Sequence, residues 1–180
     1  INRTFIWSGD ASVFPAIIKY IEDRKNAKQD ILDKDVRCIL VVEDSPRMYS
    51  ILLPLLYKEI MYQTKNLINR RLSKSKTLLL LRARPKVLLT QNYETAKLFF
   101  NRYKNNMLGI ISDVEFLKNK KKNKNAGFDF VKWVRNIDQS IPILIQSSQE
   151  KNQTLAEDMG ADFLHKESPT FLKKLRNFMN

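Results

Sequence analysis

The apolar residues of this chain form short buried runs that alternate with longer stretches of helical spacing. Five runs contain almost only apolar residues, as in strands that are buried on both faces of a parallel sheet. We expect strands at Val36–Val42, Lys86–Thr90, Met107–Ser112, Ile141–Gln146 and Asp162–His165. Helical patterns follow them, at 46–81, Tyr93–Tyr103, Gly127 through Val134, Gln149–Met159 and Thr170–Met179. The alternation predicts an α/β fold with a five-stranded parallel sheet that is covered by helices on both faces.

An N-terminal arm, residues 1–35, precedes the first expected strand. Phe5–Trp7 is a short apolar run, and apolar residues recur at helical spacing from Val13 to Ile21. Asp23–Asp35 is polar and is interpreted as a helix end followed by a linker. We therefore divide the chain into a strand/helix arm with a linker, 1–35, and a domain at 36–180.

The helical pattern after the first strand is about twice as long as the others. Ser45 is a suitable N-cap with Pro46 at the first helical position, and helix-forming residues continue to about Leu81. Pro54 should kink this helix or break one turn. Either one long bent helix or two helices with a seam at Leu72–Lys76 fit the pattern, with an insertion at about 58–84. Beyond residue 60 the apolar stripe can pack on a partner chain, which predicts a homodimer through this long first helix.

Charge and composition restrict the class of protein. The 180 residues include 32 Lys and Arg against 19 Asp and Glu, a net charge of +13. Many of the lysines stand among asparagines, as in Lys118–Lys124, which is interpreted as a solvated loop without aromatic interleaving. A net positive charge by itself indicates solubility and nonspecific electrostatic attraction, so nucleic acid is not the expected partner.

A single cysteine, Cys38, excludes a disulfide-stapled scaffold, and together with a single histidine it argues against a structural zinc site and a His-based catalytic triad. The longest apolar run, Cys38–Val42, is far too short to span a membrane, and we expect no signal peptide. We expect a protein of a reducing compartment, the cytoplasm. The chain begins with Ile1, so it is expected to be a piece of a longer protein.

Polar residues follow the expected strands at the edge where open parallel sheets bind ligands. Glu43 and Asp44 follow the first strand, Asp113 the third, Ser147 the fourth and Lys166 the fifth. Clustered carboxylates repel one another, and a hard divalent cation such as Mg²⁺ neutralises them. A carboxylate beside such a cation can attack a phosphoryl group, whose oxygens the hydroxyl and the lysine can hold.

Each of these residues also has a simpler interpretation. Glu43 and Asp44 can be an acidic cluster at a helix N-terminus, and Asp113 a turn residue. Ser147 can cap a helix, and Lys166 can be a surface lysine. His165 in the last strand is interpreted as structural, and Cys38 as a small core residue.

From about Val36 to Met179, the chain resembles the receiver domain of two-component response regulators. This resemblance implies a doubly wound five-stranded parallel sheet of flavodoxin-like topology, in the order 2-1-3-4-5. The resemblance rests on ILVVEDS, IISD, ILIQSS and GADFLHK, each at a strand end and in the order of the family. It implies that Asp113 is the phosphoacceptor and that Mg²⁺ is bound by Glu43, Asp44, Asp113 and the backbone carbonyl of Glu115. The resemblance further implies Ser147 as the switch hydroxyl, Lys166 as the lysine that contacts the phosphoryl group and Phe163 as the switch aromatic.

The sequence departs from the family pattern in four places. Leu117 stands where a proline is usual, and Gly127 comes late, after the lysine-rich insertion. The first helix is lengthened, Pro169 is displaced from the position after Lys166, and Phe163 lacks the hydroxyl of a tyrosine. No site residue is lost, but the usual dimerisation and output surfaces cannot be carried over.

The N-terminal arm resembles a part of the same family. The spacing of Phe5 to Tyr20 matches that of Phe163 to Phe178, so the arm is either the tail of a preceding receiver-like unit or a plain amphipathic packing helix. The WSGD, ARPKVLL and LIQSS segments also resemble the N-terminal regulatory part of large proteins related to phosphoenolpyruvate synthase and pyruvate phosphate dikinase.

Three functional hypotheses follow. The first is a regulatory receiver, not itself an enzyme, phosphorylated on Asp113 by a sensor histidine kinase or phosphotransfer protein in a Mg²⁺-dependent phosphorelay. The second is a pseudo-receiver that docks a protein or nucleic acid through its basic helix and lysine-rich loop, without Mg²⁺. The third, a phosphate-ester hydrolase, lacks an additional acid or base and ranks last.

Overall fold

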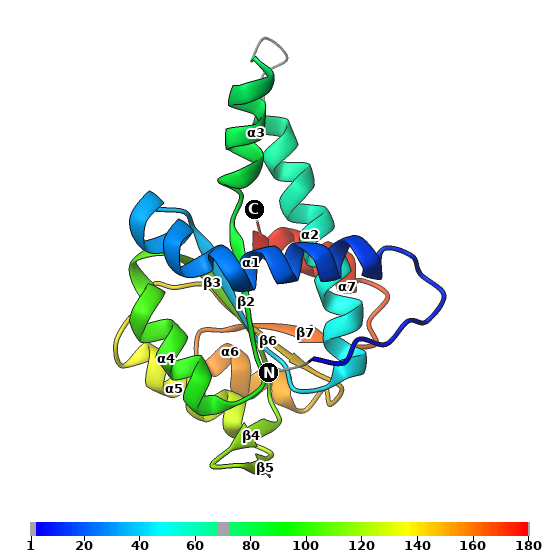
Figure 1. Cartoon of the computed structure of the whole chain (residues 1–180). Helices are drawn as coiled ribbons and strands as arrows, with labels where there is room; N and C mark the ends of the chain where they lie inside the picture. The colour runs from blue at the N-terminus through cyan, green and yellow to red at the C-terminus, as the bar shows by residue number, and fades with distance from the viewer. Residues whose placement is uncertain (1–2, 68–72, 180) are drawn as a thin grey trace.

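The computed structural model describes residues 3–67 and 73–179 (Figure 1). The sheet consists of β1 (Cys38–Val42), β2 (Lys86–Thr90), β3 (Met107–Asp113), β6 (Ile143–Ser147) and β7 (Asp162–His165). The helices are α1 (Val13–Lys34), α2 (Pro46–Leu67), α3 (Lys74–Arg82), α4 (Tyr93–Tyr103), α5 (Ala126–Arg135), α6 (Asn152–Asp158) and α7 (Phe171–Met179). A 3₁₀ turn, Lys104–Asn106, precedes β3, and β4 (Phe116–Lys118) and β5 (Lys121–Asn123) form a separate hairpin.

The five sheet strands are all parallel and stand in the order β2-β1-β3-β6-β7. Counted along the chain, this is the order 2-1-3-4-5, so the predicted flavodoxin-like sheet is confirmed. The elements also follow the predicted boundaries closely: β2 and α4 agree with them, whereas β1 and β6 each begin two residues late.

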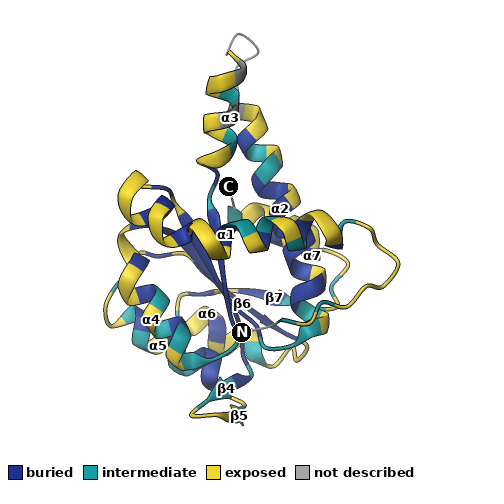
Figure 2. Ribbon diagram, viewed as in Figure 1, coloured by how far each residue is buried: buried dark blue, intermediate teal, exposed yellow. Residues whose placement is uncertain are grey.

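Both faces of the sheet are buried because successive side chains of a strand point to opposite sides. In β1, Cys38, Leu40 and Val42 lie in the core beneath α4, α5 and α6, while Ile39 and Val41 lie in the core beneath α2 and α7. Figure 2 shows the resulting buried centre and the exposed outer faces of the helices. Burial on both sides explains why the strands are almost continuously apolar.

The helix α1 packs against β2, which is an edge strand of the sheet, and crosses it in the view of Figure 1. Its first half places Tyr20 in one core and its second half places Ile31 in the other. The backbone N–H of Val87 donates to Asp23 of α1 at 2.9 Å, and Arg3 donates to the carbonyl of Leu89 at 2.8 Å. The arm thus covers and satisfies part of an edge that could otherwise pair with another chain.

The arm differs from its predicted structure in two respects. Residues 3–12 contain no strand, and the Phe5 ring packs instead on the rings of Tyr20 and Tyr49, with centroids 5.7 and 5.5 Å apart. The expected linker at Asp23–Asp35 is helical up to Lys34. The apolar periodicity missed this part because the inward side of the helix includes two charged residues, Asp23 and Asp30.

Asp23 is fully buried and joins three elements. Its Oδ2 accepts hydrogen bonds from Tyr57 of α2, at 2.9 Å, and from Nη1 of Arg84, at 3.0 Å, in addition to the Val87 N–H. Nη2 of Arg84 lies 2.8 Å from Oδ1, and the guanidinium stands over the Tyr57 ring. Burial and the neighbouring Asp23 raise the pKa of Tyr57 well above its usual value. This network ties the arm to the edge strand and to the base of α2.

The long helical region forms two helices. α2 begins at the predicted position, where Ser45 Oγ accepts from the N–H of Met48, and it continues through Pro54 to Leu67. α3 returns beside it from Lys74, so the two helices project from the body as a helical hairpin (Figure 1). The predicted seam at Leu72–Lys76 partly lies outside the described residues, as do Ile68, Arg70 and Arg71.

None of the helices described here has both the length and the apolar character that a membrane span requires.

The lysine-rich segment, predicted to be a solvated loop, is a β-hairpin. Asn119 and Lys120 form its two-residue turn with φ of 52° and 62°, as in the tight turns that suit antiparallel strands. Phe116 anchors the hairpin in the core, Lys118 pairs with Asp129, and the N–H of Asn119 donates to Glu94 at 2.8 Å. Its tip is lysine-rich and lacks the apolar alternation by which a strand is predicted.

We expect Asp23→Asn to lower the free energy of unfolding by about 3–5 kcal/mol, because the substitution removes the buried counter-charge of the Arg84 guanidinium. Urea denaturation of the whole chain measures this. Glu22→Gln is the matched control: Glu22 lies 3.5 Å from the same guanidinium, but its side chain is 45% exposed, so its loss should cost less than about 1 kcal/mol. Equal losses in the two variants would contradict the role given to Asp23.

Candidate functional site

Three carboxylates meet at the carboxyl edge of the sheet, as the strand ends predict. Glu43 and Asp44 follow β1, and Asp113 is the last residue of β3. One carboxylate oxygen from each of the three lies within 4.8 Å of the others. Lys166, directly after β7, places its ammonium 2.9 Å from Glu43 and 2.8 Å from Asp113. The acidic cluster and the lysine therefore come from three strands that are distant in sequence.

Glu43 is the most enclosed member of the cluster. Its side chain is fully buried, and it accepts hydrogen bonds from the Ser45 N–H and from the side-chain amide of Gln146, both at 3.0 Å. Burial, and then the charge of Asp113, raise the pKa of Glu43 to about 7, although Lys166 opposes this shift. The raised pKa thus reflects first the loss of solvent around Glu43 and then the like charge of Asp113.

Asp113 lies at the point where β3 meets α5. Its Oδ1 accepts from the N–H of Val114 at 2.8 Å, and its Oδ2 contacts Lys166. Burial raises the pKa of Asp113, and Lys166 opposes the shift. A Cβ on Gly127 would stand 2.2 Å from the backbone oxygen of Asp113, so only glycine allows α5 to start this close to the strand end. The glycine that is late in sequence therefore packs directly against the acidic site.

A cleft of about 490 Å³ opens over Asp113. Glu115 and Ser147 line it with Lys166. The Ser147 hydroxyl oxygen accepts hydrogen bonds from the N–H of Gln149, at 3.1 Å, and from the side-chain amide of Asn152, at 2.8 Å. Ser147 thus holds the loop before α6 and also shares the cleft with the acidic residue.

Two predicted residues of the last strand lie outside this cleft. Phe163 is buried in the core beneath α4, α5 and α6, and its role as a switch stays a prediction. His165 contacts the Ser148 carbonyl oxygen at 3.0 Å and accepts from the N–H of Glu167, so its ring joins two loops. These contacts agree with a structural histidine.

The donor set fits a hard divalent cation. The three carboxylates each place one oxygen within 4.8 Å of the others, which is the kind of oxygen-rich site that binds Mg²⁺. The pKa values of Glu43 and Asp113 are raised, and a bound cation would favour the ionised form of each carboxylate. The cluster is partly neutralised by lysines. Burial disfavours the charged form of Lys166, but Glu43 and Asp113 together raise its pKa above the usual value.

Two residues of the site were not found from sequence. The side-chain amide of Gln146 donates a hydrogen bond to Glu43. In the sequence, Gln146 stands out as a polar residue in an otherwise apolar strand, directly before Ser147. Lys122 of β5 binds both oxygens of Asp44, at 2.7 and 2.8 Å. Its role could not be inferred from a run of similar lysines, because the hairpin register decides which of them reaches the site.

No family model and no curated protein matches the sequence. Several solved structures are similar, and two of them are described here. A response regulator receiver domain protein from Clostridium thermocellum has 18% identity, with 81% of this chain and 92% of that chain covered and a TM-score of 0.56. The Mn²⁺-bound form of the response regulator Rcp1 has 14% identity, with 78% and 90% covered and a TM-score of 0.50.

These comparisons do not support the further resemblance to proteins related to phosphoenolpyruvate synthase. The similarity to both structures spans about four fifths of the chain and agrees with the strand order and flanking helices described above. The chain therefore has the flavodoxin-like fold of response regulator receiver domains.

Proposed function

We propose that the protein is a phosphoacceptor receiver domain that acts as a regulatory switch in the cytoplasm. The observation that supports this most is the position of Asp113, which lies in an open cleft together with Lys166 and within the acidic cluster. The donor would be a sensor histidine kinase or a phosphotransfer protein. The metal ligands would be Glu43, Asp44, Asp113 and the backbone carbonyl of Glu115.

In the proposed reaction, a carboxylate oxygen of Asp113 forms the new bond to phosphorus as the bond between phosphorus and the donor imidazole breaks. The imidazole leaves with the electron pair of that bond and takes up a proton. Lys166 is placed to hold a phosphoryl oxygen, and Ser147 can turn from its loop contacts to do the same. A bound Mg²⁺ would neutralise charge on the transferred group. Movement of Ser147 would then change the loop before α6 and, with Phe163, the surface that partners bind.

We further propose that the arm (1–35) and the domain at 36–180, with its helical insertion at about 58–84, work as one regulatory unit. The support is the packing of α1 on the edge of the sheet.

A homodimer through the long first helix also stays a proposal. The projecting hairpin offers Tyr62 and Leu79, which are 60% and 64% exposed.

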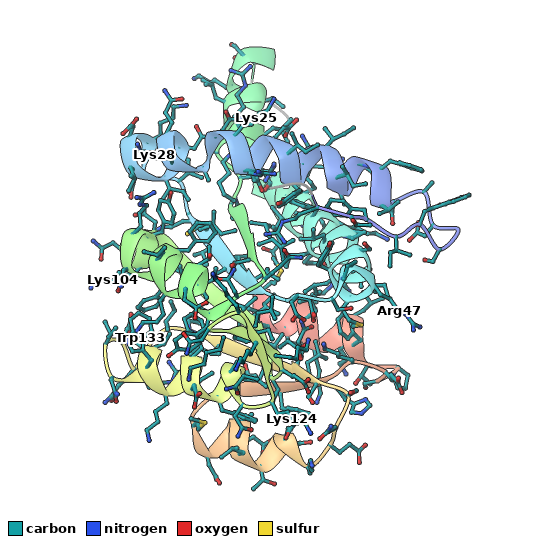
Figure 3. The ribbon with its side chains drawn as sticks, turned by 60° about the horizontal axis from the view of Figure 1, so that its bottom comes forward. Lys25, Lys28, Arg47, Lys104, Lys124 and Trp133 are labelled. Atoms are coloured by element: carbon teal, nitrogen blue, oxygen red, sulfur yellow. The ribbon has the colours of Figure 1, made fainter. Side chains whose placement is uncertain are left out.

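The second candidate is a pseudo-receiver that docks a partner without being phosphorylated. One observation favours it: all three carboxylates of the cluster already contact lysines within the chain. Figure 3 shows Lys28 and Lys104 on one flank of the molecule, with Arg47 on the opposite flank. Because the labelled cations are spread over several sides, a single basic docking face is not favoured. The experiments below separate the two candidates.

We expect intact-mass spectrometry to detect one added phosphoryl group after the chain is incubated with Mg²⁺ and acetyl phosphate. Asp113→Asn should show no gain, because the amide is not a nucleophile toward phosphorus, whereas His165→Ala should be labelled like the wild type. Equal labelling of the wild type and Asp113→Asn would contradict the assignment of Asp113. The absence of label in the wild type would favour the pseudo-receiver.

We also expect Mg²⁺ to raise the midpoint of thermal unfolding, because a ligand that binds only the folded chain stabilises it, by about 2.7 kcal/mol at one hundred times its dissociation constant. Asp44→Asn should abolish most of this rise, since it removes one of the three carboxylates. Glu22→Gln, in α1 and outside the cluster, is the control and should respond like the wild type. An undiminished rise in Asp44→Asn would exclude Asp44 as a ligand.

A further inference from the structure

Two lysines share the neutralisation of the acidic cluster. Lys166 contacts Glu43 and Asp113, whereas Lys122 from the β4–β5 hairpin contacts both carboxylate oxygens of Asp44. The two lysines differ in their surroundings. The Lys166 side chain is 11% exposed, while 49% of the Lys122 side chain remains exposed to solvent.

The position of Lys122 is fixed by a structured element. In the hairpin register, Lys122 pairs with Leu117, and Leu117 itself forms a bridge to Asn92 at the start of α4. The buried Phe116 ring and the ion pair between Lys118 and Asp129 hold the base of the hairpin, as described above. The hairpin therefore presents one particular lysine to the site, although its neighbours are lysines as well.

We infer that Lys122 competes with the divalent cation for Asp44 and thereby sets the cation affinity of the site. This inference rests on the proposed function, in which Asp44 is a metal ligand. The Lys122 ammonium contacts both oxygens of Asp44, and its positive charge would repel a divalent cation bound to either oxygen, so the binding of one weakens the binding of the other. Of the two lysines, Lys122 is the one that leaves, because its half-exposed ammonium is easily rehydrated on its flexible stem.

The competition couples the hairpin to the site. Cation binding frees the Lys122 ammonium into the cleft that also contains Asp113, where it meets a phosphoryl group or an acidic side chain of the phosphodonor. By thermodynamic linkage, an anion that captures Lys122 raises the affinity of the cation by the same factor. Lys122 is therefore a regulator of the metal site rather than a surface charge of the insertion.

The test is a calorimetric titration of the whole chain with Mg²⁺ alone. We expect Lys122→Gln to bind Mg²⁺ about fivefold more tightly than the wild type, which is the effect of removing a competing half-exposed ion pair of about 1 kcal/mol. Lys122→Arg keeps the charge and should stay close to the wild type. Lys124→Gln is the matched control, because Lys124 lines the same cleft, and its effect should stay below about twofold. Thermal unfolding in EDTA checks that each variant folds.

Equal affinity of the wild type and Lys122→Gln would overturn the inference and leave the proposed function intact. A gain in Lys124→Gln as large as that in Lys122→Gln would overturn it as well, because general electrostatics would then suffice. If no variant binds Mg²⁺, Lys122→Gln included, the proposed function itself fails and the inference with it. Binding by Lys122→Gln alone would support the inference in its strongest form.

Discussion

A carboxylate can stay buried in this protein only where a cation is buried or held beside it, and this requirement shapes both the edge and the carboxyl end of the sheet. At the edge, the guanidinium of Arg84 accompanies Asp23 and thereby fixes the arm against β2. At the carboxyl end, Lys166 accompanies Glu43 and Asp113. At the edge, one guanidinium faces one buried carboxylate, and Asp23 also receives hydrogen bonds from Tyr57 and the backbone. At the carboxyl end, one lysine faces two buried carboxylates, and burial raises the pKa of both.

This difference in compensation separates a structural site from a functional one. The network around Asp23 is closed, because Tyr57, Arg84 and the edge strand enclose it, and it can only stabilise the fold. The acidic cluster adjoins an open cleft, and its three carboxylates have different degrees of enclosure. Glu43 is held from several sides, whereas Asp44 is held by one half-exposed lysine. A site with one replaceable counter-ion can respond to what binds in it.

The sequence predicted those parts of the fold in which burial is apolar and local. The strands and the helices α4 and α7 follow apolar runs or apolar stripes, and the convergence of Asp113 with Glu43 and Lys166 follows from parallel strands that end at one edge. The prediction failed where charged residues face inward or where a turn decides the structure. Asp30 is buried beside Lys86, so the apolar pattern predicts a linker where the second half of α1 stands. The hairpin depends on two residues of positive φ, a property that a lysine-rich sequence does not reveal.

The packing of the arm against β2 also determines where the folded unit can be divided. A fragment that begins at residue 36, the boundary suggested by the apolar pattern, would retain Arg84 without its counter-charge and would expose the outward N–H of Val87. Such an open edge is a template for pairing with a second molecule. The arm therefore covers an edge that could pair with a second sheet, and a shortened version of this receiver-like unit has to keep helix α1 to keep that edge covered.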